Sequence, residues 1–298
     1  MESKYGTLYV VATPIGNLAD LSERAIRILA AVDLVAAEDT RSAARLFQYA
    51  KITPTRRSYH DHNKEAVTPE IIGMLAEGRD VALISEAGTP AVSDPGFYLV
   101  RAAHRLGIPV RVVPGPCAAV AALSISGIPT DQFYFAGFLP RGKKKRPYLE
   151  EALLLNVTVV FYESPKRILK TLSALHELIP DRLICLTREL TKIYEESRID
   201  DAGRLYDYYK KRPEECRGEF TLIIAPEGYR IDEDHDVKTT QVSCSPLADA
   251  IDEIMVRQVD LLVEAGYRPS EAVRIVARGH DVPKNALYQA HLADPTST

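Results

Sequence analysis

Polar side chains gather where short apolar segments of this sequence end, and their types suit ligand binding and proton transfer. The segment Glu38-Asp39-Thr40-Arg41 follows Leu34–Ala37, and Ser85-Glu86-Ala87-Gly88-Thr89-Pro90 follows Val81–Ile84. Carboxylates accept protons and orient hydroxyl or ammonium groups, and a Gly/Pro turn lets backbone approach a ligand closely. The first cluster has an alternative structural explanation, namely a helix N-cap beside a surface ion pair.

Similar clusters follow two apolar segments in the second half of the chain. Tyr162-Glu163-Ser164-Pro165-Lys166-Arg167 follows Val157–Phe161, and Arg188-Glu189-Leu190-Thr191-Lys192 follows Arg182–Leu186. In open α/β sheets, ligands bind at the carboxyl ends of the strands. Because several such clusters share this position, a binding site is favoured over unrelated solvated loops.

Two further turns bear on the kind of ligand. Thr13-Pro14-Ile15-Gly16-Asn17 stands where a dinucleotide-binding protein would carry Gly-x-Gly-x-x-Gly, so that motif is absent. This segment either lines a ligand site or forms a tight strand–helix turn. Pro114-Gly115-Pro116-Cys117-Ala118-Ala119 places small side chains after a rigid turn, which leaves space for a bulky planar ligand or packs against a sheet. His60-Asp61-His62 lacks a third ligand nearby and indicates a polar loop, so no metal site is expected.

The elements that must position these clusters alternate between strand and helix. The predicted strands are Leu8–Ala12, Leu34–Ala37, Val81–Ile84, Val110–Val113, Gln132–Phe138, Val157–Phe161, Arg182–Leu186 and Glu219–Ala225. The predicted helices run through Ala25–Val32, with Asp20 and Glu23 as a variant capping box, and over Ala66–Glu77, Phe97–Leu106, Cys117–Ser124 and Pro165–Leu178. This β-α alternation predicts the α/β class for both halves and, for the first half, a parallel sheet with flanking helices.

Four parts are expected along the 298 residues. An N-terminal α/β domain spans 1–128 and a second α/β domain spans 129–230. An acidic, polar linker covers 231–246. A small helical domain covers 247–298, with helices over Leu247–Glu264, Ser270–Arg278 and Pro283–Leu292.

Charge and composition restrict the environment and partners. The net charge is −4, so binding to nucleic acid would need a local basic patch. Arg141-Gly142-Lys143-Lys144-Lys145-Arg146 supplies one, and either a polyanionic partner or a solubilising loop would explain it. The four cysteines form no Cys-x-x-Cys pair, which favours a reduced, cytoplasmic compartment. No apolar run approaches the roughly 18 residues of a membrane helix, and no signal peptide or membrane association is expected.

Several short motifs resemble one known family in their order and spacing. The chain is similar to the ribosomal RNA small subunit methyltransferase I family of the tetrapyrrole methylase-like superfamily, from about Gly6 to Leu292. The motifs are Thr13-Pro14-Ile15-Gly16-Asn17-Leu18, Ala37-Glu38-Asp39-Thr40-Arg41, Ala87-Gly88-Thr89-Pro90, Ser93-Asp94-Pro95-Gly96, Pro114-Gly115-Pro116-Cys117-Ala118-Ala119, Gly137-Phe138-Leu139-Pro140, Phe161-Tyr162-Glu163-Ser164-Pro165, Arg188-Glu189-Leu190-Thr191-Lys192 and Lys284-Asn285-Ala286-Leu287-Tyr288.

The resemblance implies two α/β domains with S-adenosyl-L-methionine in the cleft between them. It further implies 2′-O-methylation of a cytidine ribose in the decoding region of 16S rRNA, and a homodimer. Because the net charge is −4, the expected substrate is a shaped site on the assembled 30S subunit rather than bare RNA. The donor pocket implied by the motifs consists of Pro14, Ile15, Glu86, Thr89, Cys117, Ala118, Tyr162, Leu190 and Leu222. Family members usually carry Asp in place of Glu86, whose longer side chain reaches the ligand only if it folds back or the loop shifts.

Residues on the substrate side remain a set of alternatives. Asp39, Glu163 or Glu189 is expected to accept the 2′-hydroxyl proton, and Arg41, Lys166, Arg188 and Lys192 are expected to bind phosphate and orient the ribose. Two rival functions stay open. A tetrapyrrole methylase would act on a small molecule, whereas a non-catalytic rRNA-binding assembly factor would have lost donor binding. The helical tail either contacts the ribosomal subunit or packs on the catalytic body.

Overall fold

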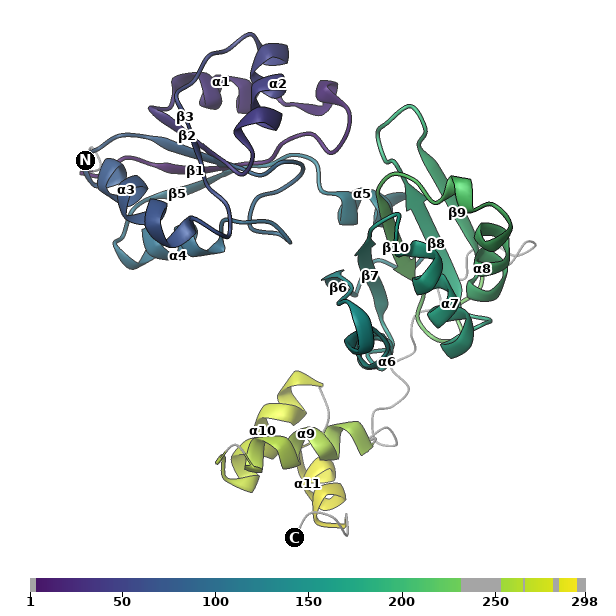
Figure 1. Cartoon of the computed structure of the whole chain (residues 1–298). Helices are drawn as coiled ribbons and strands as arrows, with labels where there is room; N and C mark the ends of the chain where they lie inside the picture. Colours follow the sequence, from purple (N-terminus) through teal and green to yellow (C-terminus); the bar gives the residue numbers. More distant parts are fainter. Residues whose placement is uncertain (1–3, 232–252, 265, 281–283, 294–298) are drawn as a thin grey trace. The chain divides into compact units, whose positions relative to one another are not determined.

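The computed structural model describes residues 4–231, 253–264, 266–280 and 284–293 (Figure 1). The chain divides into two compact units, 1–231 and 232–298. The predicted linker 231–246, apart from Ile231, and the first residues of the predicted helix Leu247–Glu264 lie outside the described residues.

The first sheet consists of five parallel strands in the order β3-β2-β4-β1-β5. They are β1 (Leu8–Val11), β2 (Leu34–Ala37), β3 (Arg56–Ser58), β4 (Val81–Ile84) and β5 (Val110–Val113). The predicted α/β class with a parallel sheet is confirmed. The edge strand β3 was not predicted, because its short polar sequence Arg-Arg-Ser lacks the apolar pattern of a buried strand.

Helices cover both faces of this sheet, as Figure 1 shows. They are α1 (Glu23–Ala31), α2 (Thr40–Ala50), α3 (Lys64–Ala76) and α4 (Phe97–Arg105). Val35 and Ala37 of β2 pack with α1 and α2, whereas Leu34 and Ala36 pack with α3 and α4. Alternate residues of one strand therefore enter two separate cores, which explains its continuous apolar sequence.

The expected capping box of α1 is wrong. Ser22 is the N-cap, and its hydroxyl accepts a hydrogen bond of 3.1 Å from the amide of Ala25. Asp20 lies instead at the end of a short 3₁₀ helix, Leu18–Asp20. A serine placed directly before the helix satisfies the free amides of its first turn, so Asp20 has no capping role left to fill.

The second sheet is mixed, with the order β6-β7-β10-β8-β9. Its strands are β6 (Phe133–Phe138), β7 (Thr158–Glu163), β8 (Leu183–Arg188), β9 (Glu196–Asp201) and β10 (Phe220–Ile224). Only the β6–β7 pair is parallel among these strands. One face packs against α6 (Lys145–Leu153), α7 (Ile168–Leu178) and α8 (Ala202–Lys211). The elements α2, α6, β9 and α8 are additions to the predicted set.

Helix α5 (Ala118–Ile125) covers the opposite face of this second sheet. Its buried residues Ala119, Ala122 and Leu123 pack against Val160 of β7 and Ile223 of β10. The helix directly follows β5 of the first sheet, so the crossover between the two halves belongs to the core of the second.

The remaining unit contains α9 (Glu253–Glu264), α10 (Pro269–Gly279) and α11 (Lys284–Ala293). Val256, Val259, Val273 and Leu287 form its own small core. The predicted fold of two α/β sheets and a small helical part is thus confirmed. Of the helices that the structure describes, none is long and apolar enough to cross a membrane.

Candidate functional site

A cavity of about 690 Å³ lies at the carboxyl ends of the first sheet's strands and continues along the second half. Residues after β1, β2, β4 and β5 line one side, and residues from β6, β7, β10 and the loop after β8 line the other. Its volume falls within the range of roughly 300–1,000 Å³ typical of small-molecule sites. The polar lining residues include Thr13, Glu38, Ser42, Arg45, Ser85, Glu86, Thr89, Ser93, Asp94, Tyr162, Glu163, Lys192, Glu219 and Thr221.

A hydrogen bond and a close approach are among the contacts that join the halves beside this cavity. The amide of Asn17 donates a hydrogen bond of 3.2 Å to the Thr191 hydroxyl. A Cβ placed on Gly137 of β6 would lie 3.1 Å from the Ser93 hydroxyl oxygen. The loops that carry the sequence motifs are therefore in contact across the cavity.

The backbone of these rim loops adopts a conformation that is costly for residues with a side chain. Positive φ angles occur at Ala91 (68°), Ser93 (62°), Glu189 (53°) and Thr191 (65°). Each such residue costs on the order of 1–3 kcal/mol and persists only where its surroundings hold it. This strain is concentrated in two loops that border the cavity, where it fixes the direction of their side chains.

Three carboxylates line the cavity without a cationic partner among the described residues: Glu38, Glu86 and Asp94. The Glu86 amide donates to the Glu38 carboxylate at 3.2 Å, and the Ser42 hydroxyl donates to the Glu86 carboxylate at 3.0 Å. Burial, together with the negative charge of Glu86, raises the pKa of Glu38. The cavity therefore has one strongly acidic wall.

Asp94 has the most perturbed carboxyl group on this wall. Burial, followed by repulsion from Glu38, raises the pKa of Asp94 to about 6, although a hydrogen bond from Ser85 opposes this shift. At neutral pH the group is mostly ionised yet retains substantial affinity for a proton. That combination is what a general base requires.

The expected proton acceptors Asp39, Glu163 and Glu189 are all engaged elsewhere. Asp39 caps α2 and pairs with Arg41 at 3.0 Å, and hydrogen bonds from Arg41 lower the pKa of Asp39. Glu163 lines the cavity, but its wholly buried carboxylate pairs with Arg167 and Lys145. Neither Asp39 nor Arg41 lines the cavity, and Arg41 is 91% exposed.

The loop after β8 places its charged residues in ion pairs. Arg188 pairs with Glu196 at 2.7 Å, and Lys192 pairs with Glu189 at 2.9 Å and Glu219 at 3.1 Å. Burial alone would raise the pKa of Glu189, but hydrogen bonds from Lys192 and from the Glu219 amide outweigh it, so this pKa is lowered. Of this loop only Lys192 lines the cavity, while Lys166 is an exposed residue after β7.

The structure brings most of the expected donor-pocket residues together. Pro14, Ile15, Glu86, Thr89, Cys117, Ala118 and Tyr162 line the cavity. Leu190 is partly buried and packs against the same core cluster as Cys117 and Tyr162. Leu222 is fully buried in the core beneath α6, α7 and α8, whereas its neighbours Glu219, Phe220 and Thr221 line the cavity.

Tyr162 links the two halves of this wall. Its hydroxyl accepts a hydrogen bond of 3.0 Å from the Ala119 amide at the start of α5. Burial and the neighbouring Cys117 raise the pKa of Tyr162, which keeps the phenol protonated. This contact fixes the small-residue turn before α5 against β7.

Asp94 and Ser42 are site residues that the sequence did not identify. The residue types of Ser93-Asp94-Pro95-Gly96, a cap residue and then Pro, are typical of a helix start and favour a structural role. The N-cap of α4 is nevertheless Gly96, with a φ of 146° that only glycine adopts readily. Asp94 is therefore free to face the cavity. Ser42 lies in the first turn of α2, so predicting that helix would have been the available signal.

The side chains that line this cavity fit S-adenosylmethionine. That molecule carries a positive sulfonium and a positive ammonium group, which suit the acidic wall of Glu38, Glu86 and Asp94. Its planar adenine suits the small side chains of Ala87, Cys117 and Ala118. Within the part of the chain that the structure describes, no cluster of three or more His, Cys, Asp or Glu residues could hold a metal ion.

Comparisons with known proteins identify the family of this chain. Residues 7–205 match the family of Tetrapyrrole (Corrin/Porphyrin) Methylases. A protein of Halalkalibacterium halodurans named ribosomal RNA small subunit methyltransferase I is 42% identical over 290 residues, covering 96% of this chain and 94% of its own. The protein of the same name from Pseudomonas aeruginosa is 42% identical over 289 residues, covering 96% and 97%.

A solved structure shows the same fold. Uroporphyrin-III C-methyl transferase from Thermus thermophilus, complexed with S-adenyl homocysteine, superposes with a TM-score of 0.51. It is 19% identical and covers 74% of this chain and 97% of its own. The two-sheet architecture thus agrees with that of the methylases. The chain belongs to the tetrapyrrole methylase family and, within it, to the group of proteins named ribosomal RNA small subunit methyltransferase I.

Proposed function

We propose that this protein is an S-adenosylmethionine-dependent methyltransferase of small-subunit ribosomal RNA, and that it methylates the 2′-hydroxyl of a cytidine in the decoding region of 16S rRNA. The observation that carries the proposal is the near full-length similarity, at about 40% identity, to proteins named for that activity. The acidic cavity supports it, because methyl donation from a sulfonium needs a site that tolerates positive charge.

When bound in this cavity, S-adenosylmethionine would supply the methyl group, with the thioether sulfur as the leaving group. The protein must hold the ribose oxygen in line with the methyl carbon and the sulfur. Positioning of this kind supplies on the order of 7–11 kcal/mol when the reacting atoms lie about 3 Å apart. The hydrogen bond between the Asn17 amide and the Thr191 hydroxyl links the two walls, which serves such positioning.

Asp94 is the proton acceptor in this proposal. It lines the cavity, has no cationic partner among the described residues, and titrates with a pKa of about 6. The alternatives Asp39, Glu163 and Glu189 are held by Arg41, Arg167 and Lys192, respectively. A carboxylate paired with a cation is a weaker base than one that is not.

Binding of the RNA is assigned to residues outside the acidic wall. Arg41 is exposed at the start of α2, and Lys166 is exposed after β7, so both are available to phosphate. Arg188 and Lys192 stabilise the loop after β8 through their ion pairs. The assembled 30S subunit is the proposed substrate, the cytoplasm the compartment and a homodimer the active form.

The test combines two measurements. Isothermal titration with S-adenosylmethionine measures donor binding, and transfer of a tritiated methyl group to 30S subunits lacking the modification measures catalysis. We expect micromolar or tighter binding and label in a single 16S rRNA cytidine, located by its resistance to alkaline cleavage. Donor binding with transfer only to a tetrapyrrole would indicate a small-molecule methylase. RNA binding without donor binding would indicate an assembly factor.

A further inference from the structure

The basic segment 141–146 divides its charges between the protein and the solvent. Arg146 pairs with Glu150 and Glu177, and Lys145 turns inward toward Glu163. Arg141, Lys143 and Lys144 are exposed and form no ion pair with any described residue. A loop that served only to solubilise the protein would not need to keep three cations together on a chain whose net charge is −4.

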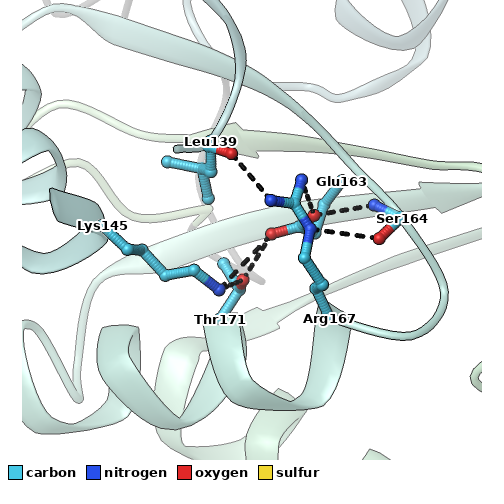
Figure 2. Close-up of polar contacts among 6 residues, drawn as sticks. All are labelled: Leu139, Lys145, Glu163, Ser164, Arg167 and Thr171. Carbon is cyan, nitrogen blue, oxygen red and sulfur yellow. Dashed lines mark hydrogen bonds and ion pairs between the residues drawn. The ribbon is translucent and has the colours of Figure 1, made fainter. Parts of the chain in front are cut away.

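Behind this loop lies a buried network centred on the Glu163 carboxylate at the end of β7 (Figure 2). Arg167 Nη2 lies 2.6 Å from Glu163 Oε1. Lys145 Nζ lies 3.6 Å from Glu163 Oε2, and the Thr171 hydroxyl donates to the same oxygen at 2.7 Å. Burying a carboxylate together with two cations costs free energy of desolvation. We therefore attribute the network to the segments that it positions.

The network holds the loop at both of its ends. Arg167 Nη1 donates a hydrogen bond of 2.9 Å to the carbonyl oxygen of Leu139, just before the basic segment. At the other end, Lys145 Nζ donates to the Thr171 hydroxyl at 2.7 Å. Figure 2 shows the two cations approaching Glu163 from opposite sides. The exposed cations are thereby presented on a fixed backbone, which lowers the entropic cost of binding.

The loop is also continuous with the cavity. Phe138, which precedes it, lines the cavity and packs edge-on against Tyr162 with ring centroids 5.4 Å apart. Glu163 lines the cavity as well. A polymer whose reacting nucleotide occupies the cavity must leave it across the rim, and the clamped basic loop adjoins one part of that rim.

We propose that Arg141, Lys143 and Lys144 bind the phosphates of the RNA strand that flanks the target nucleotide, and that the Glu163 network positions them. This inference rests on the proposed function and adds a binding surface to it. In this assignment Glu163, Lys145 and Arg167 are positioning residues, and none of them takes part in proton transfer.

The experiment compares two double variants that each remove two exposed lysines. K143A/K144A removes charge from the loop, whereas K210A/K211A removes the same charge from the last turn of α8, whose residues do not line the cavity. For K143A/K144A we expect a several-fold higher KM for 30S subunits, with kcat and donor affinity unchanged. For binding to 16S rRNA, the slope of log K against log salt concentration should become shallower by about 1.4, since each of the two lost phosphate contacts contributes about 0.7.

The outcomes separate the two proposals. Absence of methyl transfer by the unaltered protein would overturn the proposed function itself. Methyl transfer by the unaltered protein, with K143A/K144A equal to K210A/K211A in KM and salt dependence, would overturn only the phosphate-binding loop. Weaker binding of K143A/K144A to 30S subunits but not to protein-free 16S rRNA would assign the loop to a ribosomal protein and also overturn the RNA contact.

Discussion

Gly16 and Lys192 meet where the two α/β halves face each other, and a Cβ on Gly16 would lie only 2.5 Å from Lys192 Cγ. It would also lie 3.1 Å from the carbonyl oxygen of Leu190. In Gly16→Ala, therefore, Lys192 must leave its ion pairs with Glu189 and Glu219 or the loops must separate. We expect donor affinity to fall several-fold in isothermal titration.

Gly73→Ala is the matched control for this change. Gly73 lies within α3, and a Cβ there would meet no atom within 4 Å. Its free energy of unfolding should rise by up to about 1 kcal/mol because alanine is the better helix former, with donor affinity unchanged. Equal donor affinities for both variants would show that the Gly16 contact does not shape the cavity.

Asp94→Asn should abolish most turnover because the amide cannot accept the proton. Donor affinity should fall far less than turnover, since Glu38 and Glu86 still line the acidic wall. A general base typically contributes about 10²–10⁴-fold to the rate. In the unaltered protein, kcat/KM should rise with pH through about 6, the pKa of Asp94, and then level off. Retention of the same rising limb in Asp94→Asn would assign that limb to another group.

The raised pKa of Asp94 also predicts how stability depends on pH. The folded protein holds the proton up to about pH 6, whereas the unfolded chain releases it near 3.8, so raising the pH through this window destabilises the fold. Asp94→Asn removes this loss of folding stability at higher pH. Its melting temperature relative to the unaltered protein should therefore increase between pH 4 and pH 7, as measured by calorimetry.

Glu163→Gln tests the buried network through stability. It leaves Lys145 and Arg167 beside a neutral amide, and both are mostly buried. We expect the free energy of unfolding, measured with urea, to fall by about 3 kcal/mol. This value is at the lower end of the range for broken buried ion pairs because both cations keep some contact with water. Glu150→Gln removes an exposed pair with Arg146 and should cost no more than about 1 kcal/mol.

Glu86→Asp tests the acidic wall. The shorter side chain cannot keep the 3.0 Å hydrogen bond from Ser42 without a shift of the loop, and its carboxylate becomes free to face the donor. We expect donor affinity to stay the same or to increase in isothermal titration. A marked loss would mean that the Ser42 contact is needed to shape the cavity wall.

The buried strands could be predicted because burial on both faces of a sheet requires apolar residues at consecutive positions. Leu34–Ala37 and Val81–Ile84 have the predicted bounds, since each is an uninterrupted apolar segment. Strand β9, with the sequence Glu-Ser-Arg-Ile-Asp-Asp, has no apolar run because it lies at a sheet edge. Helix α6 was missed because it begins within the basic segment and contains Pro147.

The site could be located from sequence but its chemistry could not be assigned. The rule that ligands bind beyond the carboxyl ends of strands brings Ile15, Glu86 and Cys117 to one cavity. Which acids remain unpaired depends on contacts between residues far apart in the chain, such as Lys145 with Glu163. Asp94 emerges as the candidate base only after its competitors are seen to be paired.

The placement of α5 has a consequence for how the chain folds. Because this helix completes the second sheet's core while following the last strand of the first, the second half does not bury its apolar surface alone. A fragment ending at residue 128 would expose Ala122 and Leu123 to water. A fragment starting there would lack α5 and leave Ile223 uncovered. The region 4–231 lies within one compact unit, and we expect a chain break near residue 128 to destabilise the second half by removing the helix that covers its sheet.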